Sequence, residues 1–474
     1  MKLRSAGFIM LLGLVFGAIF LGLVGALSGY VLVENKLQRT NASSEEAFSI
    51  AEAGVEAYKW FLAHYPGNTT YGTGHAGPYV STYYDPENGT AGTISLSING
   101  TTACGQTTSI KISSTGTPAD DASVSKTVSA TYAQPSVATY SYILNDSVWA
   151  GADRVILGPY HSNGGIRMDG TANSPVTSSV SSWTCTSSFG CSHNTTEPGV
   201  FGAGSPSNLW SYPTPQVDFS AIAADFSGLK STAQTSGKYF TYGTKSSQQN
   251  GIHLIFNANG TVTVKKVTSV NSPSVDAFVD GSSGSTDYSL IKNETTLGTY
   301  TLASDCGLVF VENRAWIEGT ITGKVTIVVA DVTDANGAVD AIIPNNLTYS
   351  AYDGTVGLTV IAQHDVLIGP TSPSTMTMNG IFIAQNGAFG RNLYDCPGTY
   401  EGGNGSSRLN SLTILGTTVS NKRTGTKWIN GCGFYGDAGY QNRTDSYDRT
   451  LASSPPPFTP AVSTDYELMD WHEN

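Results

Sequence analysis

An uncharged apolar run near the N-terminus constrains this chain more than any other feature. Residues 8–33, FIMLLGLVFGAIFLGLVGALSGYVLV, contain no charged side chain. As an α-helix rising ~1.5 Å per residue the run is about 39 Å long, whereas a bilayer core is roughly 30 Å thick. A helix satisfies its own backbone hydrogen-bonding groups, as hydrocarbon requires. The run therefore predicts one membrane-spanning helix.

The residues before this run predict its orientation. Lys2 and Arg4 hold the N-terminus in the cytoplasm while the polar remainder of the chain crosses, which gives a single-pass, N-in/C-out topology. The alternative is a cleaved secretory signal, because Ala26 and Ser28 resemble a small-residue cleavage site. Such signals have an apolar core of only ~7 to 15 residues, so the length of the run favours the membrane span.

The segment after the run predicts that the helix continues. Residues 34–64 lack proline and consist mostly of good helix formers, and Pro66 and Gly67 follow them. Apolar residues recur at three- and four-residue steps, at Phe48, Ala51, Val55, Tyr58 and Leu62. We expect one rod from Phe8 to about Leu62, apolar in its first half and amphipathic in its second.

The N-terminal residues resemble the start of type IV prepilins. A short basic leader ends at Gly7, Phe8 opens the uncharged helix, and SSEEAFSIAEAGVEAYKWF follows. The pattern is most similar to that of the PilX-type minor pilins, through Ala47, Phe48, Ala51, Glu52, Ala53, Gly54, Val55, Glu56 and Ala57. The resemblance implies a leader of residues 1–7, cleavage between Gly7 and Phe8 by a prepilin peptidase, N-methylation of Phe8, and packing of helix 8–64 against other pilins.

One position departs from the family pattern. Major pilins carry a glutamate at the fifth residue after cleavage, where this chain has Leu12. In the family that carboxylate pairs with the amine of a neighbouring subunit, and an unpaired charge in hydrocarbon is costly. Pseudopilins and minor pilins at a filament tip can lack this glutamate, so Leu12 favours a tip or initiating role.

Small residues in the apolar run predict a seam for helix packing. They stand four apart in overlapping series that include Gly13, Gly17, Ala18, Gly22 and Ala26. Small side chains let a second helix backbone approach closely. A lone anchor without a partner helix stays an alternative, because Gly and Ala are frequent in membrane helices.

The composition of the remaining chain is that of an extracellular β protein. Of 474 residues only 13% are charged, whereas there are 53 glycines and 24 tyrosines. The net charge of −12 and the lack of a basic stripe argue against nucleic-acid binding, and the sequence contains no phosphate-binding loop motif. We expect no nucleic-acid partner and no cofactor.

Strand and turn patterns divide the ectodomain into four parts. Residues 68–134 alternate apolar and polar positions, as in a small antiparallel sheet that packs on the upper half of the helix. Residues 135–300 predict a β-rich region with one helix near 219–236, capped by Asp218 and stopped by Gly237.

Residues 301–430 repeat short apolar runs between Gly or Asn turns, which predicts a right-handed β-helix or related solenoid, with an irregular β-sandwich as the alternative. Residues 431–474 predict a C-terminal strap that covers an edge of the solenoid. Three prolines give it polyproline geometry, and its anchors are Phe458, Tyr466 and Trp471. The expected fold class is thus mainly β with one long N-terminal α-helix.

All 6 cysteines follow the membrane segment, where disulfides persist. Fifteen pairings are open. We favour Cys185 with Cys191 and Cys396 with Cys432, which leaves Cys104 with Cys306. No CxxC occurs, so we expect no zinc site.

Candidate chemical residues are sparse. Asp331, Asp334, Asn336 and Asp340 loosely resemble a calcium loop, but the bidentate Glu at its twelfth position is missing, so we expect a turn and no metal. His161 beside Ser162 and Asn163 has no assignable base, orienting acid or nucleophile. His364 and Asp365 also read as a turn. We expect no catalytic residue and no enzyme.

The sequence thus predicts a minor pilin or pilus-tip-associated structural protein, acting in type IV pilus or pseudopilus assembly, adhesion or surface contact. Its expected partners are other pilins through the N-terminal helix, the inner membrane before assembly, and a surface glycan or protein. Two alternatives stay open. A membrane-anchored carbohydrate-active enzyme would need a cleft with two carboxylates about 5 to 10 Å apart. A surface adhesin outside any filament would keep its leader uncleaved.

Overall fold

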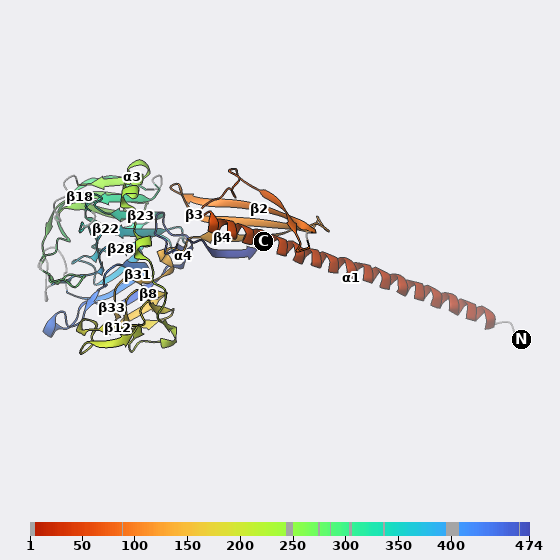
Figure 1. Ribbon diagram of the computed structural model, residues 1–474, viewed down its shortest axis with the longest axis horizontal. Coiled ribbons are helices and arrows are strands. Elements are labelled where there is room, and N and C mark those ends of the chain that lie inside the picture. The colour runs from red at the N-terminus through yellow and green to blue at the C-terminus, as the bar shows by residue number, and fades with distance from the viewer. Residues whose placement is uncertain are drawn as a thin grey trace. The chain divides into compact units, whose positions relative to one another are not determined.

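The computed structural model describes residues 5–87, 89–242, 250–273, 275–284, 286–302, 306–334, 337–394, 407–463 and 465–474. The chain forms two compact units. The first unit comprises Met1–Thr101, Ser109–Ala133 and Leu468–Asn474, and the second comprises Thr102–Thr108 and Gln134–Glu467. The fold is mainly β with one long N-terminal helix (Figure 1), as the sequence predicts.

The first unit combines the long helix with one sheet. Helix α1, Ser5–His64, runs without a break, so the predicted continuation beyond the apolar run is confirmed. The sheet has the order β1-β2-β3-β4-β34, with β1 and β2, and β3 and β4, pairing antiparallel. Its strands are β1 Tyr79–Tyr84, β2 Thr90–Ala103, β3 Gln106–Pro118, β4 Lys126–Ala133 and β34 Glu467–Glu473.

The amphipathic half of α1 packs on this sheet (Figure 1). The predicted apolar positions Ala51, Val55, Tyr58 and Leu62 are all buried. Phe48 is only half-buried, and its ring meets the edge of the Trp471 ring at a centroid distance of 6.1 Å. Burial of this stripe against the sheet, rather than helix propensity alone, fixes the second half of the helix.

The last strand lies elsewhere than predicted. We expected the whole of residues 431–474 to run along the solenoid, yet β34 is the edge strand beside β4. The backbone N–H of Asn474 donates to the carbonyl of Thr127, and Lys126 pairs with Glu473 at 2.6 Å. The expectation was wrong here because the open edge of β4 offers unpaired backbone groups, which an extended strand satisfies.

The earlier part of the strap does follow the second unit. The hydroxyls of Thr359 and Thr459 are 2.7 Å apart, the hydroxyl of Thr326 donates to the carbonyl of Pro457, and Phe458 packs on the main core. A short helix, α4 Arg449–Ser453, precedes this stretch.

The second unit is built on one continuous row of strands in which every neighbouring pair is parallel. In spatial order the row is β16 Lys238–Thr241, β21 Leu308–Glu312, β23 Lys324–Val329, β26 Gly357–Ala362, β28 Thr375–Ala384, β31 Arg408–Ser420, β5 Tyr142–Leu144, β8 Tyr160–Ser162, β11 Val176–Ser178 and β15 Trp210–Ser211.

The chain enters this row in the middle. It begins at β5, advances to β15 at one end, resumes at β16 at the other end, and returns to β31, which pairs with β5. Figure 1 shows this order by colour, with yellow and green strands at opposite ends of the unit and blue strands between them. The row therefore extends beyond the predicted range 301–430 into residues 142–211. Parallel pairing is the arrangement that a solenoid requires, and the right-handed β-helix stays a prediction.

Further rows flank the first. One parallel row contains β17 Gly251–Asn257, β22 Ala315–Ile321, β24 Ala341–Ile343, β27 Val366–Ile368 and β29 Phe389–Gly390, and β25 Leu347–Tyr349 joins β22 to β28. Two others contain β33 Ala438–Ser446, β7 Arg154–Leu157 and β10 Thr171–Ala172, and β6 Val148–Ala150, β9 Ile166–Met168 and β14 Val200–Phe201.

The second unit also contains five antiparallel strand pairs among the described residues. They are β17 with β18 Thr261–Asn271, β18 with β20 Leu290–Thr301, β12 Ser182–Cys185 with β13 Thr195–Pro198, β19 Val275–Ala277 with β30 Leu393–Tyr394, and β32 Lys427–Trp428 with β33. The turn at Asn259 and Gly260 joins β17 to β18.

Apolar side chains stack from strand to strand inside the second unit. Val309 aligns with Ile327, Ile327 with Val360, and Val360 with Phe382, and all four are fully buried. Each strand covers the apolar face of the next, so the core is continuous along the row.

The predicted helix near 219–236 is divided in two. Helix α2, Phe219–Ile222, begins at Asp218, whose carboxylate accepts from the N–H of Ser220 as expected. Helix α3, Phe226–Ser236, has its own cap at Asp225 and ends at Gly237. The break occurs because Asp225 starts a new helix and the N–H of Ala224 donates to the side chain of Gln385.

Candidate functional site

The first half of α1 presents an exposed apolar surface. Within the helix an 18-residue window reaches a mean hydropathy of 2.6, and none of that window is buried. Phe8 is 67% exposed. Leu12, which stands where major pilins carry a glutamate, is 44% exposed. In length and composition this helix is able to cross a membrane.

The small-residue seam lies on this exposed half. A β-carbon built on Gly13, Gly17 or Gly22 would meet no other atom within 4 Å. Ala18 and Ala26, in the same series, are also exposed. The seam is therefore open in the single chain, and its packing against another helix stays a prediction.

Glycines set the fit between the second half of α1 and the sheet. A β-carbon on Gly54 would stand 2.2 Å from the hydroxyl of Ser114, and one on Gly116 of β3 would stand 2.2 Å from the carbonyl oxygen of Ala47. The Tyr58 hydroxyl donates to the carbonyl of Asn68 at 2.5 Å. Close approach of the two backbones holds the amphipathic half in one orientation on the sheet.

The predicted processing site lies at the beginning of the helix. Gly7 and Phe8 both fall within α1, which begins at Ser5. Cleavage between them and methylation of Phe8 stay predictions.

Two disulfides occur among the described residues. Cys185 and Cys191 are bonded across a sequence separation of 6, and Cys104 and Cys306 across a separation of 202, with both ends of the latter in the second unit. Cys432 is also disulfide-bonded. Cys396 lies outside the described residues, so its pairing with Cys432 stays a prediction.

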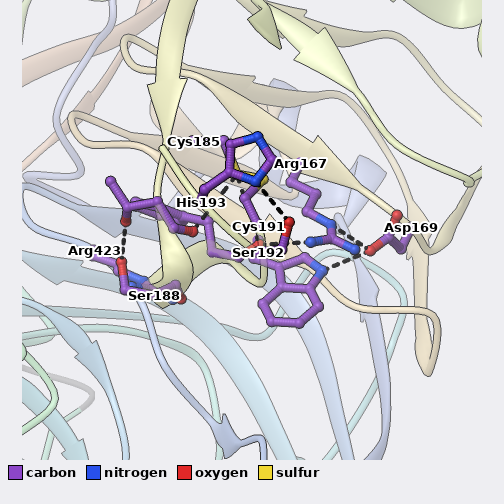
Figure 2. Close-up of a disulfide and its surroundings, with 11 residues drawn as sticks. Arg167, Asp169, Cys185, Ser188, Cys191, Ser192, His193 and Arg423 are labelled. Carbon is purple, nitrogen blue, oxygen red and sulfur yellow. Dashed lines mark hydrogen bonds and ion pairs between the residues drawn. A yellow bond between two sulfur atoms is a disulfide. The ribbon is translucent and has the colours of Figure 1, made fainter. Parts of the chain in front are cut away.

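The short disulfide loop is tied to two arginines (Figure 2). Arg167 donates through Nη1 to the carbonyl of Phe189 at 2.9 Å and through Nε to Asp169 at 2.8 Å. Arg423 donates to the carbonyl of Ser188 at 2.7 Å, although the two residues are 235 positions apart in sequence. The loop is thus held against a distant part of the chain.

An acid–histidine cluster lies where the sequence suggested a turn. In the part of the chain that the structure describes, the acid and histidine ligand atoms close enough to share a metal ion are those of Asp340, His364 and Asp365. His364 Nδ1 is 3.0 Å from Asp340 and 3.3 Å from Asp365. Arg314 pairs with the other oxygen of Asp340 at 2.5 Å.

Charges within this cluster are already balanced by protein groups. Hydrogen bonds to Asp340 and Asp365 raise the pKa of His364 to about 10, so its imidazolium is the cation between two buried carboxylates. Burial raises the pKa of Asp365, whereas for Asp340 Arg314 and His364 outweigh the effect of burial and lower the pKa. A metal would have to displace a proton and compete with Arg314, so the geometry favours an ion network.

The remaining calcium-loop candidates lie apart from this group. Asp331 accepts from both the N–H and the hydroxyl of Thr333, which forms a turn. Asp334 is not part of the cluster formed by Asp340, His364 and Asp365, and Asn336 lies outside the described residues.

His161 is part of the buried strand β8. Its ring nitrogens lie 2.8 Å from the Thr177 hydroxyl and 3.0 Å from the Asn163 side-chain oxygen. Burial lowers its pKa. The interactions are those of a satisfied structural histidine.

Sequence reasoning missed a cationic pocket in the second unit, of about 630 Å³, lined among others by Arg154, Arg423, Lys427 and Arg443. Arg154 is distant in sequence from the other three, and no local spacing marks the four as a group. The only signal was the nearness of Arg423 and Lys427 to Trp428 in KRTGTKWIN.

No protein-family model and no curated protein matches this chain. A solved structure described as the competence-associated pilin ComZ from Thermus thermophilus aligns with a TM-score of 0.35 and 12% sequence identity, over 91% of this chain and 97% of that one.

Proposed function

We propose that this protein is a minor subunit of a type IV pilus or a related filament, anchored in the membrane by α1 before assembly. The observation that carries the proposal is the division of α1, whose first half is apolar and exposed while its second half buries one apolar stripe against the sheet of the first unit. Such a helix anchors the chain through one half and holds a folded unit through the other.

The residues around the start of the apolar run support this role. Lys2 and Arg4 place the N-terminus in the cytoplasm and the two folded units outside, and the prepilin-like residues Gly7 and Phe8 mark where the leader would be removed. The signature from Ala47 to Ala57 makes the PilX-type minor pilins the family of first choice.

Leu12 favours a tip or initiating position over a repeating one. With no carboxylate in the apolar run, the helix has no group to pair with the N-terminal amine of a neighbour. The protein then acts in assembly, adhesion or surface contact, and its partners in the membrane are other pilins packed along the open glycine seam.

The test is the N-terminus of the mature protein. Full-length protein is recovered from native membranes and from sheared filaments, and intact mass and N-terminal sequencing are measured. We expect a chain that begins at Phe8 with a methylated amine. Gly7→Glu should retain the leader, whereas the control Gly13→Ala should be processed like the natural chain.

Two results would overturn the proposal. An intact Met1 in both preparations would leave a membrane-anchored surface protein that never enters a filament. A start near Gly29 would remove the anchor and leave a secreted protein.

A further inference from the structure

The pocket in the second unit collects positive charge in an acidic protein. It has a volume of about 630 Å³, and its cations come from two parts of the chain: Arg154 from β7, and Arg423, Lys427 of β32 and Arg443 of β33 from residues 423–443. Within the described residues no aspartate or glutamate lines this pocket. The chain as a whole carries a net charge of −12, so the pocket has a local excess of positive charge in a protein that is negative overall.

Three of these cations form ion pairs with carboxylates that are not among the lining residues. Arg154 pairs with Asp445 at 2.5 Å, and Arg443 donates to both oxygens of Asp153 at 2.8 and 3.1 Å. Lys427 lies 3.4 Å from the Asp153 carboxylate. These pairs fix the cationic side chains in place and keep the acidic groups out of the pocket surface.

Arg423 differs from the others. Its guanidinium donates to the Ser188 carbonyl and lies 4.2 Å from the centre of the Phe189 ring. Among the residues that the structure describes, no carboxylate lies within ion-pairing distance of it. Burial lowers its pKa, and the more distant charge of Asp146 only partly opposes this effect. An anion in the pocket would offset the cost of burying this cation.

Aromatic faces and hydroxyls line the same space. The indole of Trp149 donates to Asp169 at 2.8 Å and that of Trp428 to the carbonyl of Arg391 at 2.9 Å, so both rings are held rigidly by their N–H groups. Ser187 and Thr426 add hydroxyls to the lining. The wall thus offers apolar ring faces, hydroxyl groups and, among the described residues, one guanidinium that forms no ion-pair contact.

We propose that this pocket binds an acidic sugar, a pyranose ring that carries a carboxylate. The carboxylate pairs with Arg423, the C–H face of the ring packs on Trp428, and the ring hydroxyls bond to the hydroxyls and exposed backbone of the lining. The volume suits one or two sugar rings.

A nucleic-acid strand fits the same surface less well. Strands need a basic groove that tracks several phosphates, whereas these cations line one pocket in a chain of strong negative charge. The inference does not depend on the filament role, because it concerns only the second unit.

Isothermal titration calorimetry on the detergent-solubilised full-length protein tests the proposal. The probes are galacturonate, digalacturonate, neutral galactose, inorganic phosphate and a short oligothymidylate. We expect both acidic sugars to bind, with galactose at least about tenfold weaker because it lacks the charge-assisted hydrogen bonds. Arg423→Gln should weaken digalacturonate about tenfold or more, and Trp428→Leu should weaken it while leaving the preference for acidic over neutral sugars.

Arg449→Gln is the matched control, since Arg449 is exposed and lies outside the lining. It should bind like the natural chain, and thermal melting should show that Arg423→Gln is folded. The proposal is overturned if neither acidic sugar binds, if galactose binds as tightly, or if folded Arg423→Gln retains full affinity. Binding of phosphate or oligothymidylate that displaces digalacturonate and exceeds its affinity would assign the pocket to phosphate ligands instead.

Discussion

The backbone of Gly116 on β3 lies so close to Ala47 of α1 that a β-carbon at Gly116 would stand 2.2 Å from the Ala47 carbonyl oxygen and 2.6 Å from the N–H nitrogen of Ala51. Both obstacles are backbone atoms of a helix, which cannot rotate away as a side chain can. This contact sets the distance between the helix and the sheet in the first unit.

We therefore expect Gly116→Ala to lower the free energy of unfolding of the first unit by about 1 to 3 kcal/mol, because the added methyl group forces the helix and sheet apart. Chemical denaturation followed by circular dichroism measures the change. The control is Gly13→Ala, where an added β-carbon meets nothing within 4 Å. Equal stability of the two variants would contradict the proposed close contact.

The two disulfides should differ in their contribution to stability. Loss of the Cys104–Cys306 bond, which spans a sequence separation of 202, should cost about 5 kcal/mol by the chain-entropy relation, and loss of Cys185–Cys191, with a separation of 6, about 2 kcal/mol. Paired Cys→Ser variants and denaturant unfolding of the second unit measure both. Peptide mapping without reductant checks the pairing itself, and a different connectivity would refute the assignment.

The His364 network should make the second unit sensitive to alkaline pH. The pKa of His364 in the folded protein, about 10, lies above its ordinary value of 6.5, so its contribution is complete below pH 6.5 and is lost as the pH rises through about 10. We expect His364→Gln to cost about 2 kcal/mol below pH 6.5, and this deficit to shrink above pH 10.

Thermal unfolding across this pH range measures the effect. His472→Gln serves as the control, because His472 is exposed and pairs with the exposed Asp470, an interaction of little energetic value. A deficit for His364→Gln that is the same at both ends of the range would show that packing, rather than the charge on His364, is responsible.

The glycine seam should matter for assembly and not for folding. Gly17→Leu fills the small-residue surface, so it should reduce the amount of protein in sheared filaments about tenfold without changing the thermal unfolding of either unit. Quantitative immunoblotting of filament and membrane fractions checks this. Ile19→Leu, a conservative change on an exposed residue turned about 200° from Gly17 around the helix, should leave incorporation unchanged. Normal incorporation of Gly17→Leu would remove the seam from the proposal.

Local patterns predicted the elements whose cause is local. The uncharged run and the stripe of Ala51, Val55, Tyr58 and Leu62 predict helix α1, because helical periodicity needs only near neighbours. The helix cap at Asp218 is of the same kind. In each case the residues that decide the structure lie within a few positions of one another.

The sequence by itself thus determined the apolar helix, its amphipathic continuation and the β-rich character of the rest. Only the tertiary structure decided that β31 pairs with β5, that β34 joins β4 in the first unit, and that Arg423, Arg443 and Trp149 line one pocket. The physical reason is that unpaired strand edges accept any extended segment of suitable register. Which segment arrives, and which charges it brings together, depends on the packing of the whole chain.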